Sequence, residues 1–411
     1  MPGDVVDVQI TRSKSSFMEG KAVEYHQLSP LRITPKCEHF GECGGCKWQM
    51  LPYETQLQAK QQQVEDQLRH LGDFEFPPLK AIIPSPNIYF YRNKLEFTFS
   101  NKKWLTTYSK DIDFKDRNMN ALGFHKPGMF DRILDIDNCY LQAEPSNSIR
   151  LAIREYAHKY QLSFYDVKEH KGFLRNLIIR TASTGDIMLI LVVGEDQPDN
   201  LVGLLSYVSE HFPQLTSVMY VLNQKKNDTI NDLEVQLFKG KPYIMEKMGK
   251  VQFRVGPVSF YQTNSQQAHT MYKKARKWAK LTGEELVYDL YTGTGTIANF
   301  VAHKAARVIG IEYVPEAIED AKRNSEINGI DNTEFYAGDM AKILTAEFIA
   351  EHGRPDVVIT DPPRAGMHEK VVQQLLAAAP KRIVYISCNP ATQARDITWL
   401  KEAYEVKKVQ P

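Results

Sequence analysis

Residues 286–296 read Leu-Val-Tyr-Asp-Leu-Tyr-Thr-Gly-Thr-Gly-Thr, and this stretch decides the fold of the last third of the chain. It begins as an apolar, β-prone run, continues as a glycine turn, and leads into a helical pattern at Thr296. A strand that enters a helix through such a turn opens a nucleotide-binding unit. The same alternation continues to residue 403, so the sequence predicts an α/β fold with a doubly wound parallel sheet.

This alternation is regular enough to place its elements. Strands are predicted at residues 286–290, 307–311, 333–336, 356–360 and 382–386. Helices are predicted at residues 296–303, 315–328, 340–352, 368–379 and 391–403. Because parallel strands all end at one edge of a sheet, we expect the residues that follow them to lie close together.

The turn after the first strand is typical of a nucleotide-like ligand. Gly293 and Gly295 let the backbone approach the ligand, and Glu312, at the end of the second strand, is placed to bind both ribose hydroxyls. Two features favour S-adenosylmethionine over NAD. Asp289 precedes the turn, where it can counter a cationic cofactor, and Ala298 stands where a pyrophosphate-binding turn has a third glycine.

Two further acids follow later strands. Asp339 is placed to accept a hydrogen bond from an adenine amino group. Asp361 opens the run Asp361-Pro362-Pro363-Arg364, in which the prolines form a stiff wall for a planar ring and the acid can bind a base edge; a rigid turn without such a role is the alternative. Since Gly293, Glu312, Asp339, Asp361 and Cys388 all follow strands, we expect them to line one crevice.

Cys388 follows the last predicted strand, in Ile386-Ser387-Cys388-Asn389-Pro390. A free cysteine considered alone is most often a small buried hydrophobe. Its position at the carboxyl end of a strand, beside the other polar strand ends, instead favours a nucleophile.

The remaining cysteines indicate a metal centre. Cys37, Cys43 and Cys46 form a C-x5-C-x2-C run whose glycines leave backbone N–H groups free for ligand sulfurs. If Cys388 has another task, Cys139 is the thiol left to act as a fourth ligand. Zinc and an iron–sulfur cluster both accept four thiolates.

Composition sets broad limits. Lys plus Arg (51) and Asp plus Glu (50) nearly cancel, so a nucleic-acid-binding face must be local. No apolar stretch approaches the roughly 20 residues that span a bilayer, and the N-terminus lacks a signal-peptide pattern. We therefore expect no membrane contact and a cytoplasmic location.

The upstream part is predicted to form two units before the domain at 256–411. Residues 1–33 read as a pair of strands from a partial β-barrel, and residues 34–255 as an α+β domain. A helix at 52–71 within it is expected to pack on the C-terminal domain. Other central elements are strands at 94–100, 177–181, 187–193 and 217–222 and helices at 147–160 and 201–211.

Residues 89–94 read Tyr-Phe-Tyr-Arg-Asn-Lys and interleave aromatic rings with cations. This mixture suits base stacking combined with phosphate contact. An ordinary edge strand with a charged outer face is an equally good interpretation of the composition.

Together these motifs resemble those of the RNA 5-methyluridine methyltransferases. The matching runs are the C-x5-C-x2-C cysteines, Gly256-Pro257-x-Ser259-Phe260-x-Gln262-x-Asn264, Asp289-Leu290-Tyr291-x-Gly293-x-Gly295, Asp361-Pro362-Pro363-Arg364-Ala365-Gly366 and Ser387-Cys388-Asn389-Pro390. The resemblance covers nearly the whole chain and is closest to the iron–sulfur branch that modifies 23S ribosomal RNA. It implies a Rossmann-like methyltransferase domain at 256–411 and a TRAM-like segment at 1–33.

The resemblance also implies roles for individual residues. It implies a [4Fe–4S] cluster on Cys37, Cys43, Cys46 and Cys139. It implies that Gln262, Tyr291, Glu312 and Asp361 contact S-adenosylmethionine, together with Gly293, Gly295 and Thr296 of the turn and Asp339. Cys388 is implied as the nucleophile that adds to uracil C6. The family's general base, a glutamate near its C-terminus, is expected beyond Pro411, where we expect the chain to be trimmed.

The expected activity is therefore S-adenosylmethionine-dependent C5-methylation of a uridine, by a monomer whose partner is RNA. We favour 23S ribosomal RNA, and uridine 54 of transfer RNA is the alternative substrate. Two readings from other classes stay open: a non-catalytic RNA-binding iron–sulfur protein, and an iron–sulfur redox enzyme that binds NAD.

Overall fold

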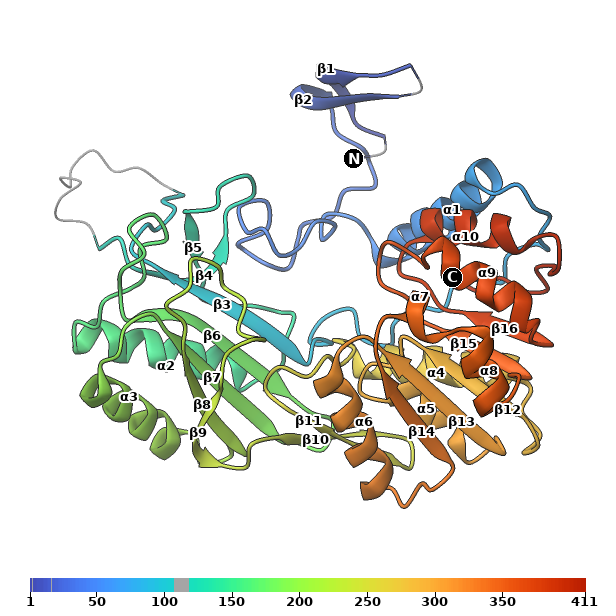
Figure 1. Ribbon diagram of the computed structural model, residues 1–411. Coiled ribbons are helices and arrows are strands. Elements are labelled where there is room, and N and C mark those ends of the chain that lie inside the picture. The colour runs from blue at the N-terminus through green and yellow to red at the C-terminus, as the bar shows by residue number, and fades with distance from the viewer. Residues whose placement is uncertain (2, 16, 107–117) are drawn as a thin grey trace.

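The chain folds around two large sheets, with a small hairpin at its N-terminus (Figure 1). The computed structural model describes residues 1, 3–15, 17–106 and 118–411. Within these ranges, no helix is both long and apolar enough to cross a membrane.

The N-terminal hairpin pairs β1 (Val5–Ser13) with β2 (Met18–Gln27) in antiparallel register. Most of its side chains are exposed, and in Figure 1 it stands apart from both large sheets. The predicted pair of N-terminal strands is thus confirmed.

The central sheet contains seven strands in the order β5-β4-β3-β6-β7-β8-β9. Its strands are β3 (Lys94–Ser100), β4 (Ala121–His125), β5 (Ile133–Asp135), β6 (Leu174–Thr181), β7 (Ile187–Val193), β8 (Ser217–Leu222) and β9 (Gln236–Gly240). Helices α2 (Ser146–Lys159) and α3 (Pro198–His211) cover one face, where Ile149, Ile153 and Leu204 join the buried core (Figure 1). The strands and helices predicted in this region are confirmed.

The C-terminal sheet contains five parallel strands in the order β14-β13-β12-β15-β16. Its strands are β12 (Leu286–Leu290), β13 (Arg307–Glu312), β14 (Thr333–Ala337), β15 (Val357–Thr360) and β16 (Arg382–Tyr385). Because the chain runs from β12 to one side and later returns to β15 on the other, β12 lies at the topological switch point where such sheets bind ligands. The predicted doubly wound α/β fold is confirmed.

Helices cover both faces of this sheet. Since successive strand residues point to opposite faces, adjacent residues of β12 pack in different cores. Val287 packs in a core with residues of α4 (Ser265–Ala279), α5 (Thr296–Ala302) and α6 (Pro315–Ile327). Tyr288 packs in a second core with residues of α7 (Met340–Ile343), α8 (Ala346–His352) and α9 (Glu369–Ala378). The sheet is therefore buried on both faces, as its apolar strands require.

The helix predicted at 340–352 is wrong as a single element, because it is broken into α7 and α8. Thr345 lies between the two and caps the second, since its Oγ1 accepts a hydrogen bond from Phe348 N at 3.3 Å. A threonine hydroxyl competes with the helical backbone in this way, so an apolar pattern that spans it can be two helices.

The two sheets share one core through a short hairpin of β10 (Ile244–Met248) and β11 (Val251–Val255). Met188 and Ile190 of the central sheet, Phe253 of the hairpin and Val287 of the C-terminal sheet all belong to that core. The domain limits at 33/34 and 255/256 stay predictions. The shared core shows that the hairpin contacts the parts on both sides of the second limit.

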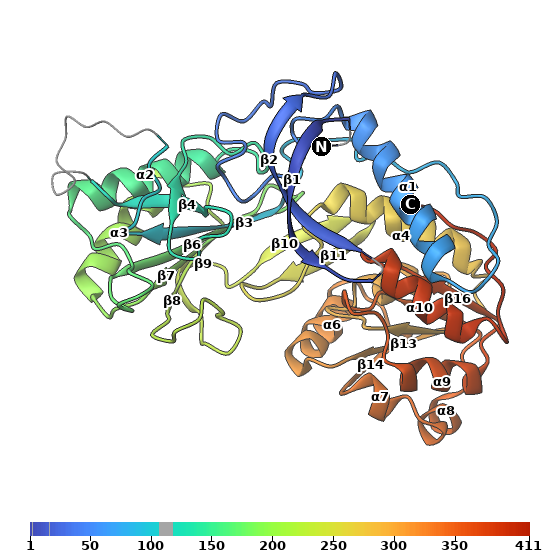
Figure 2. The same cartoon turned by 90° about the horizontal axis from the view of Figure 1, so that it is seen from above.

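Helix α1 (Tyr53–Leu71) lies beside α10 (Pro390–Leu400), far from it in sequence (Figures 1 and 2). Leu68 of α1 is buried, and just beyond the helix Asp73 N donates to Thr398 Oγ1 at 3.1 Å. An ion pair joins Asp73 to Lys401. The N-terminal part thus braces the helix that follows Cys388.

Candidate functional site

The turn after β12 has an unusual backbone. Tyr291 adopts φ = 63°, in the left-handed region that a residue with a side chain rarely occupies. Such a conformation costs about 1–3 kcal/mol and persists where the surroundings enforce it, most often at functional sites. Thr292 N donates to Ile311 O at 3.1 Å and ties the turn to β13.

The two glycines of the turn serve different purposes. At Gly295 (φ = 73°) a Cβ atom would lie 2.8 Å from the Cβ of Ala321, so the turn packs directly on α6. At Gly293 (φ = 56°) a Cβ would meet nothing within 4 Å. Gly293 therefore leaves open space beside the backbone, as a ligand that approaches the turn requires. Thr296 follows as the first residue of α5.

Asp289 is fully buried, and one of its carboxylate oxygens is bonded within the turn. Its Oδ2 accepts hydrogen bonds from Thr292 Oγ1 at 2.5 Å and from Ala298 N at 2.9 Å. Burial raises the pKa of this carboxyl to about 7. Asp289 thus ties the turn to the start of α5 through one oxygen, and its role beside a cationic cofactor stays a prediction.

Glu312 lies opposite the turn, at the end of β13. Its carboxylate accepts from Gly293 N at 3.1 Å on one oxygen, and from Tyr313 N at 2.9 Å and Val314 N at 3.1 Å on the other. These three N–H donors hold the side chain in one orientation beside the open side of the turn. The geometry brings Glu312 and Gly293 together, as the sequence predicts.

Asp339 lies next to Glu312, because Gly338 N donates to Glu312 O at 2.7 Å. The Asp339 carboxylate caps α7, since its Oδ1 accepts a hydrogen bond from Ala341 N at 3.1 Å. Its Oδ2 lies 3.7 Å from the Lys342 Nζ. Part of its hydrogen-bonding capacity is therefore already used by the helix it caps.

Asp361 follows β15 and meets Gln262, which comes from the loop before α4. The Gln262 Nε2 and Asp361 Oδ2 atoms are 3.5 Å apart. Burial raises the pKa of Asp361 to about 6, and burial also raises the pKa of the neighbouring Tyr272 hydroxyl. These side chains form a polar cluster at the end of β15 that is largely shielded from water.

Cys388 is exposed in the short segment between β16 and α10. The backbone of this segment is linked to the end of β15, since Ile386 N donates to Thr360 O at 2.8 Å. Asn389 caps α10 by accepting from Ala391 N at 3.2 Å, and its Nδ2 donates to Arg364 O at 3.1 Å. The loops that carry Asp361 and Cys388 are therefore clamped together.

The loop that carries Gln262 is held by two residues that the sequence did not indicate for this purpose. Asn93 Nδ2 donates to Gln262 O and to Ser265 Oγ, both at 2.8 Å. Arg180, which is buried, donates to Gly256 O and to Ser259 O, the latter at 2.6 Å. These partners are far apart in sequence, so no spacing or periodicity could have identified them.

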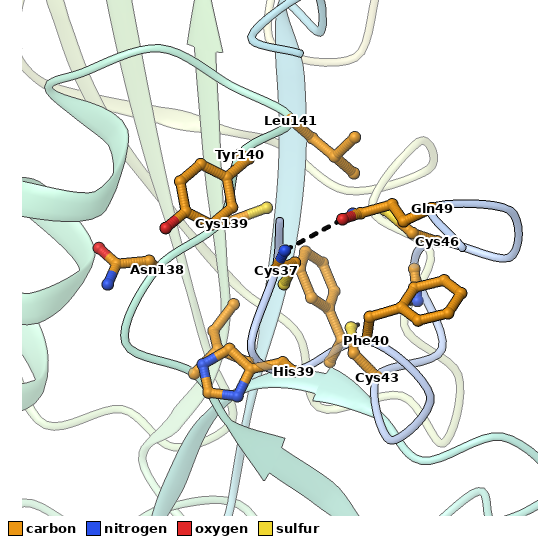
Figure 3. A pocket seen from close by; sticks show the side chains of 13 residues that line it. Cys37, His39, Phe40, Cys43, Cys46, Gln49, Asn138, Cys139, Tyr140 and Leu141 are labelled. Carbon is orange, nitrogen blue, oxygen red and sulfur yellow. Dashed lines mark hydrogen bonds between the residues drawn. The ribbon is translucent and has the colours of Figure 1, made fainter. Parts of the chain in front are cut away.

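A second candidate site lies in the central part of the chain. Four thiols line one pocket there: Cys37, Cys43 and Cys46 from a single loop, and Cys139 from the segment after β5 (Figure 3). Gly45 N donates to Cys43 Sγ at 3.3 Å, and Cys37 N donates to Gln49 Oε1 at 3.1 Å. The structure thus brings together all four of the predicted ligands.

Three of the four thiols are partly or largely shielded from water. Burial raises the pKa values of Cys37 and Cys139, and raises that of Cys43 to about 11. A metal that binds such thiols displaces their protons, because cysteine binds metals as the thiolate.

Comparison with known proteins gives consistent results. Residues 241–410 match the family model described as tRNA (uracil-5-)-methyltransferase. An uncharacterized RNA methyltransferase of Bacteroides thetaiotaomicron is 59% identical over 100% of this chain and 91% of its own length. Another from Porphyromonas gingivalis is 57% identical over 97% of this chain and 87% of its own length.

A solved structure is similar to this chain over nearly its whole length. It is the Pyrococcus abyssi tRNA (uracil-54, C5)-methyltransferase in complex with S-adenosyl-L-homocysteine. It superimposes with a TM-score of 0.72 at 29% sequence identity, over 97% of this chain and 87% of that one.

Proposed function

The chain belongs to the RNA (uracil-C5)-methyltransferase family, and from this premise we propose that it methylates C5 of a specific uridine with Cys388 as the nucleophile. S-adenosylmethionine is the methyl donor. The observation that carries the proposal is the position of Cys388. It is an exposed thiol whose loop is clamped through Arg364 O to the loop of Asp361, at the carboxyl edge of the sheet.

The proposed chemistry explains why a thiol is needed. Uracil C5 is too weak a nucleophile to take a methyl group directly. The Cys388 thiolate adds to C6, and the electron pair of the C5–C6 double bond then forms the new bond to the methyl carbon as the methyl–sulfonium bond breaks. A base removes the C5 proton, the double bond re-forms, and the C6–sulfur bond breaks to release the thiolate.

Cys388 attacks as a thiolate, and it immediately precedes Asn389, the N-cap residue of α10. The amino end of a helix carries partial positive charge, which stabilises an adjacent anion such as the sulfur that adds to C6 and later leaves.

The residues around the turn are proposed to hold S-adenosylmethionine. Glu312 and Asp339 would bind its ribose and adenine, the open backbone at Gly293 would approach it, and Gln262 and Asp361 would lie near its reactive end. Tyr291, Gly295 and Thr296 would shape the turn around it. The fixed orientation of Glu312 beside Gly293 supports this arrangement.

We propose 23S ribosomal RNA as the substrate, on the motif resemblance to the iron–sulfur branch of the family. Uridine 54 of transfer RNA is the second candidate, because the similar solved structure from Pyrococcus abyssi acts on that position.

We further propose that Cys37, Cys43, Cys46 and Cys139 hold a [4Fe–4S] cluster. The four thiols line one pocket although they come from two separate segments, and the C-x5-C-x2-C run resembles that of the iron–sulfur branch of the family. A bound cluster would fasten the loop of residues 37–46 to the segment around Cys139.

Trapping with 5-fluorouridine tests the proposed nucleophile. Fluorine at C5 cannot leave as a proton does, so the wild-type protein should form a stable RNA adduct after methyl transfer, and mass spectrometry should place it on Cys388. The C388A variant should form none, yet bind S-adenosylmethionine as the wild type does. An adduct that persists in C388A would contradict the assignment.

Mapping of 5-methyluridine in a strain that lacks the protein tests the substrate. Loss of one modified uridine in 23S ribosomal RNA would support the first candidate. Loss at transfer RNA position 54 would support the second and exclude the first.

A further inference from the structure

The segment of residues 89–93 is a loop and not the edge strand that its composition also allowed, because β3 begins only at Lys94. Within it Phe90 adopts φ = 54°, in the left-handed region. A bulky residue in that conformation is strained and is a candidate for a functional role.

Two backbone hydrogen bonds enforce this conformation. Phe90 N donates to Tyr140 O at 2.7 Å, and Arg92 N donates to Leu141 O at 2.8 Å. The loop is therefore fastened to the segment that carries Cys139, beside the pocket of the four thiols (Figure 3). The Phe90 side chain is nevertheless 43% exposed, so burial in the core does not explain why it is held there.

Three aromatic rings gather around one cation at this place. The Lys36 ammonium lies 4.9 Å from the ring centre of Tyr89, 5.2 Å from that of Phe90 and 4.8 Å from that of Tyr140. The Tyr140 ring meets the other two edge-to-face, with centres 6.3 Å from Tyr89 and 5.9 Å from Phe90. We call these four residues the aromatic platform.

We propose that the aromatic platform binds RNA, with an unpaired base stacked on the exposed ring of Phe90 and a backbone phosphate beside Lys36. The inference rests on the proposed function, since it takes RNA as the partner. Single-stranded RNA is recognised in this way, by aromatic faces for the bases and cations for the phosphates.

The composition of the platform argues for RNA over a protein partner. An exposed lysine stands among the rings, whereas the centre of a protein interface is depleted in lysine. Tyr140 packs edge-to-face with Phe90, and Phe90 is 43% exposed, so part of its ring is open to a flat ligand. The target base of the proposed reaction must leave its stack. A neighbouring base that loses its stacking partner can then stack on the platform instead.

Three substitutions at Phe90 separate stacking from folding. Phe90→Gly removes the ring and accepts the left-handed backbone without strain, so the variant should fold. Phe90→Leu keeps apolar bulk and loses the aromatic face, and Phe90→Tyr keeps both. Tyr160→Ala is the matched control. Tyr160 is 53% exposed and has the Lys159 ammonium 5.2 Å from its ring centre, but it follows the end of α2 and does not line the pocket of the four thiols.

The first readout is affinity for RNA, measured by fluorescence anisotropy with 23S ribosomal RNA fragments and with transfer RNA from a strain lacking the protein. Phe90→Gly and Phe90→Leu should weaken binding of the substrate RNA by about 5- to 150-fold, the value of one stacked base. Phe90→Tyr and Tyr160→Ala should stay within about twofold of the wild type, and S-adenosylmethionine affinity should be unchanged in all four.

The second readout detects stacking itself. A 12-nucleotide oligouridine with one internal 2-aminopurine should lose fluorescence when the wild type or Phe90→Tyr binds, and lose much less with Phe90→Gly or Phe90→Leu at saturation. Equal RNA affinity and equal quenching in the wild type and Phe90→Gly would overturn the proposal. Neither readout needs methyl transfer, so a wild type that binds RNA through Phe90 but forms no 5-methyluridine would sink the proposed function and leave this inference standing.

Discussion

The side-chain amide of Asn93 donates a hydrogen bond of 2.8 Å to the backbone carbonyl of Gln262, although the two residues lie 169 positions apart. Asn93 directly precedes β3 of the central sheet, and Gln262 lies in the loop before α4 of the C-terminal part. The same amide reaches Ser265 Oγ at 2.8 Å. The part of the chain with the aromatic platform therefore positions a residue of the proposed cofactor site.

Removal of this amide should weaken cofactor binding. In N93A the carbonyl of Gln262 loses its donor, and a lost hydrogen bond of this kind costs about 1–3 kcal/mol. We expect the S-adenosylmethionine Kd, measured by calorimetry, to rise by about tenfold. N87A is the control, because Asn87 bonds to Gln266 Oε1 across the same interface but at an exposed position; its Kd should stay within about twofold. Equal Kd values for N93A and N87A would show that Asn93 does not position Gln262.

The two turn glycines should respond differently to alanine. In G293A the new methyl group meets no protein atom within 4 Å, so the variant should fold with a loss of about 1 kcal/mol from its left-handed backbone. It should bind S-adenosylmethionine at least about tenfold more weakly if the ligand approaches this backbone.

In G295A the methyl group would lie 2.8 Å from the Cβ of Ala321, which should add about 1–3 kcal/mol of overpacking to the backbone cost. Denaturant unfolding and calorimetry measure both quantities. A G293A variant with normal affinity would exclude a close approach of the ligand at this position.

The buried carboxyl of Asp289 should make stability depend on pH. Its pKa rises from 3.8 to about 7 on folding, so the native state binds more protons than the unfolded state between these values. Its contribution to the free energy of unfolding therefore falls as pH rises from about 4 to about 7.

Asn keeps a carbonyl that can accept from Thr292 and Ala298 but does not titrate. The free energy of unfolding of D289N minus that of the wild type should thus increase between pH 5 and pH 8, as measured by urea titration. A difference that does not change with pH would mean that Asp289 stays ionised throughout this range.

Two cysteine variants should separate the two sites. C139S removes one of the four thiols around the pocket in Figure 3, so we expect protein purified without oxygen to lose most of its iron and the visible absorbance of a [4Fe–4S] cluster. C388S is the matched control, since Cys388 is exposed and lies between β16 and α10, in the other part of the chain. It should keep both the iron and the absorbance, and it should lose methylation. Loss of iron in C388S, or full iron in C139S, would contradict the assignment of the cysteines.

Much of the C-terminal fold could be predicted because its signals are local. Each apolar run such as Leu286–Leu290 is followed by a turn and an amphipathic helix, so strand, helix and parallel order follow from neighbouring residues. The exception is the break at Thr345, where a single hydroxyl that caps α8 outweighs a continuous apolar pattern.

The candidate sites were predictable only in part. Strand ends meet at one edge in any doubly wound sheet, which placed Glu312 and Asp361 correctly. The hydrogen-bond partners of Asp289 were not predictable, because its oxygens can accept from nearby protein groups or from a ligand. Here one oxygen accepts from the Thr292 hydroxyl and from Ala298 N.

By itself, the sequence determined which residues have the chemistry: a free thiol at a strand end, acids beside a glycine turn, and a dense run of cysteines. The tertiary structure decided which of them meet. It brought Cys139 to the loop of Cys37, Asn93 to the carbonyl of Gln262, and the Tyr140 ring to Phe90. These pairs are distant in sequence, and only the packing of the sheets and the closure of long loops creates such contacts, so no local pattern encodes them.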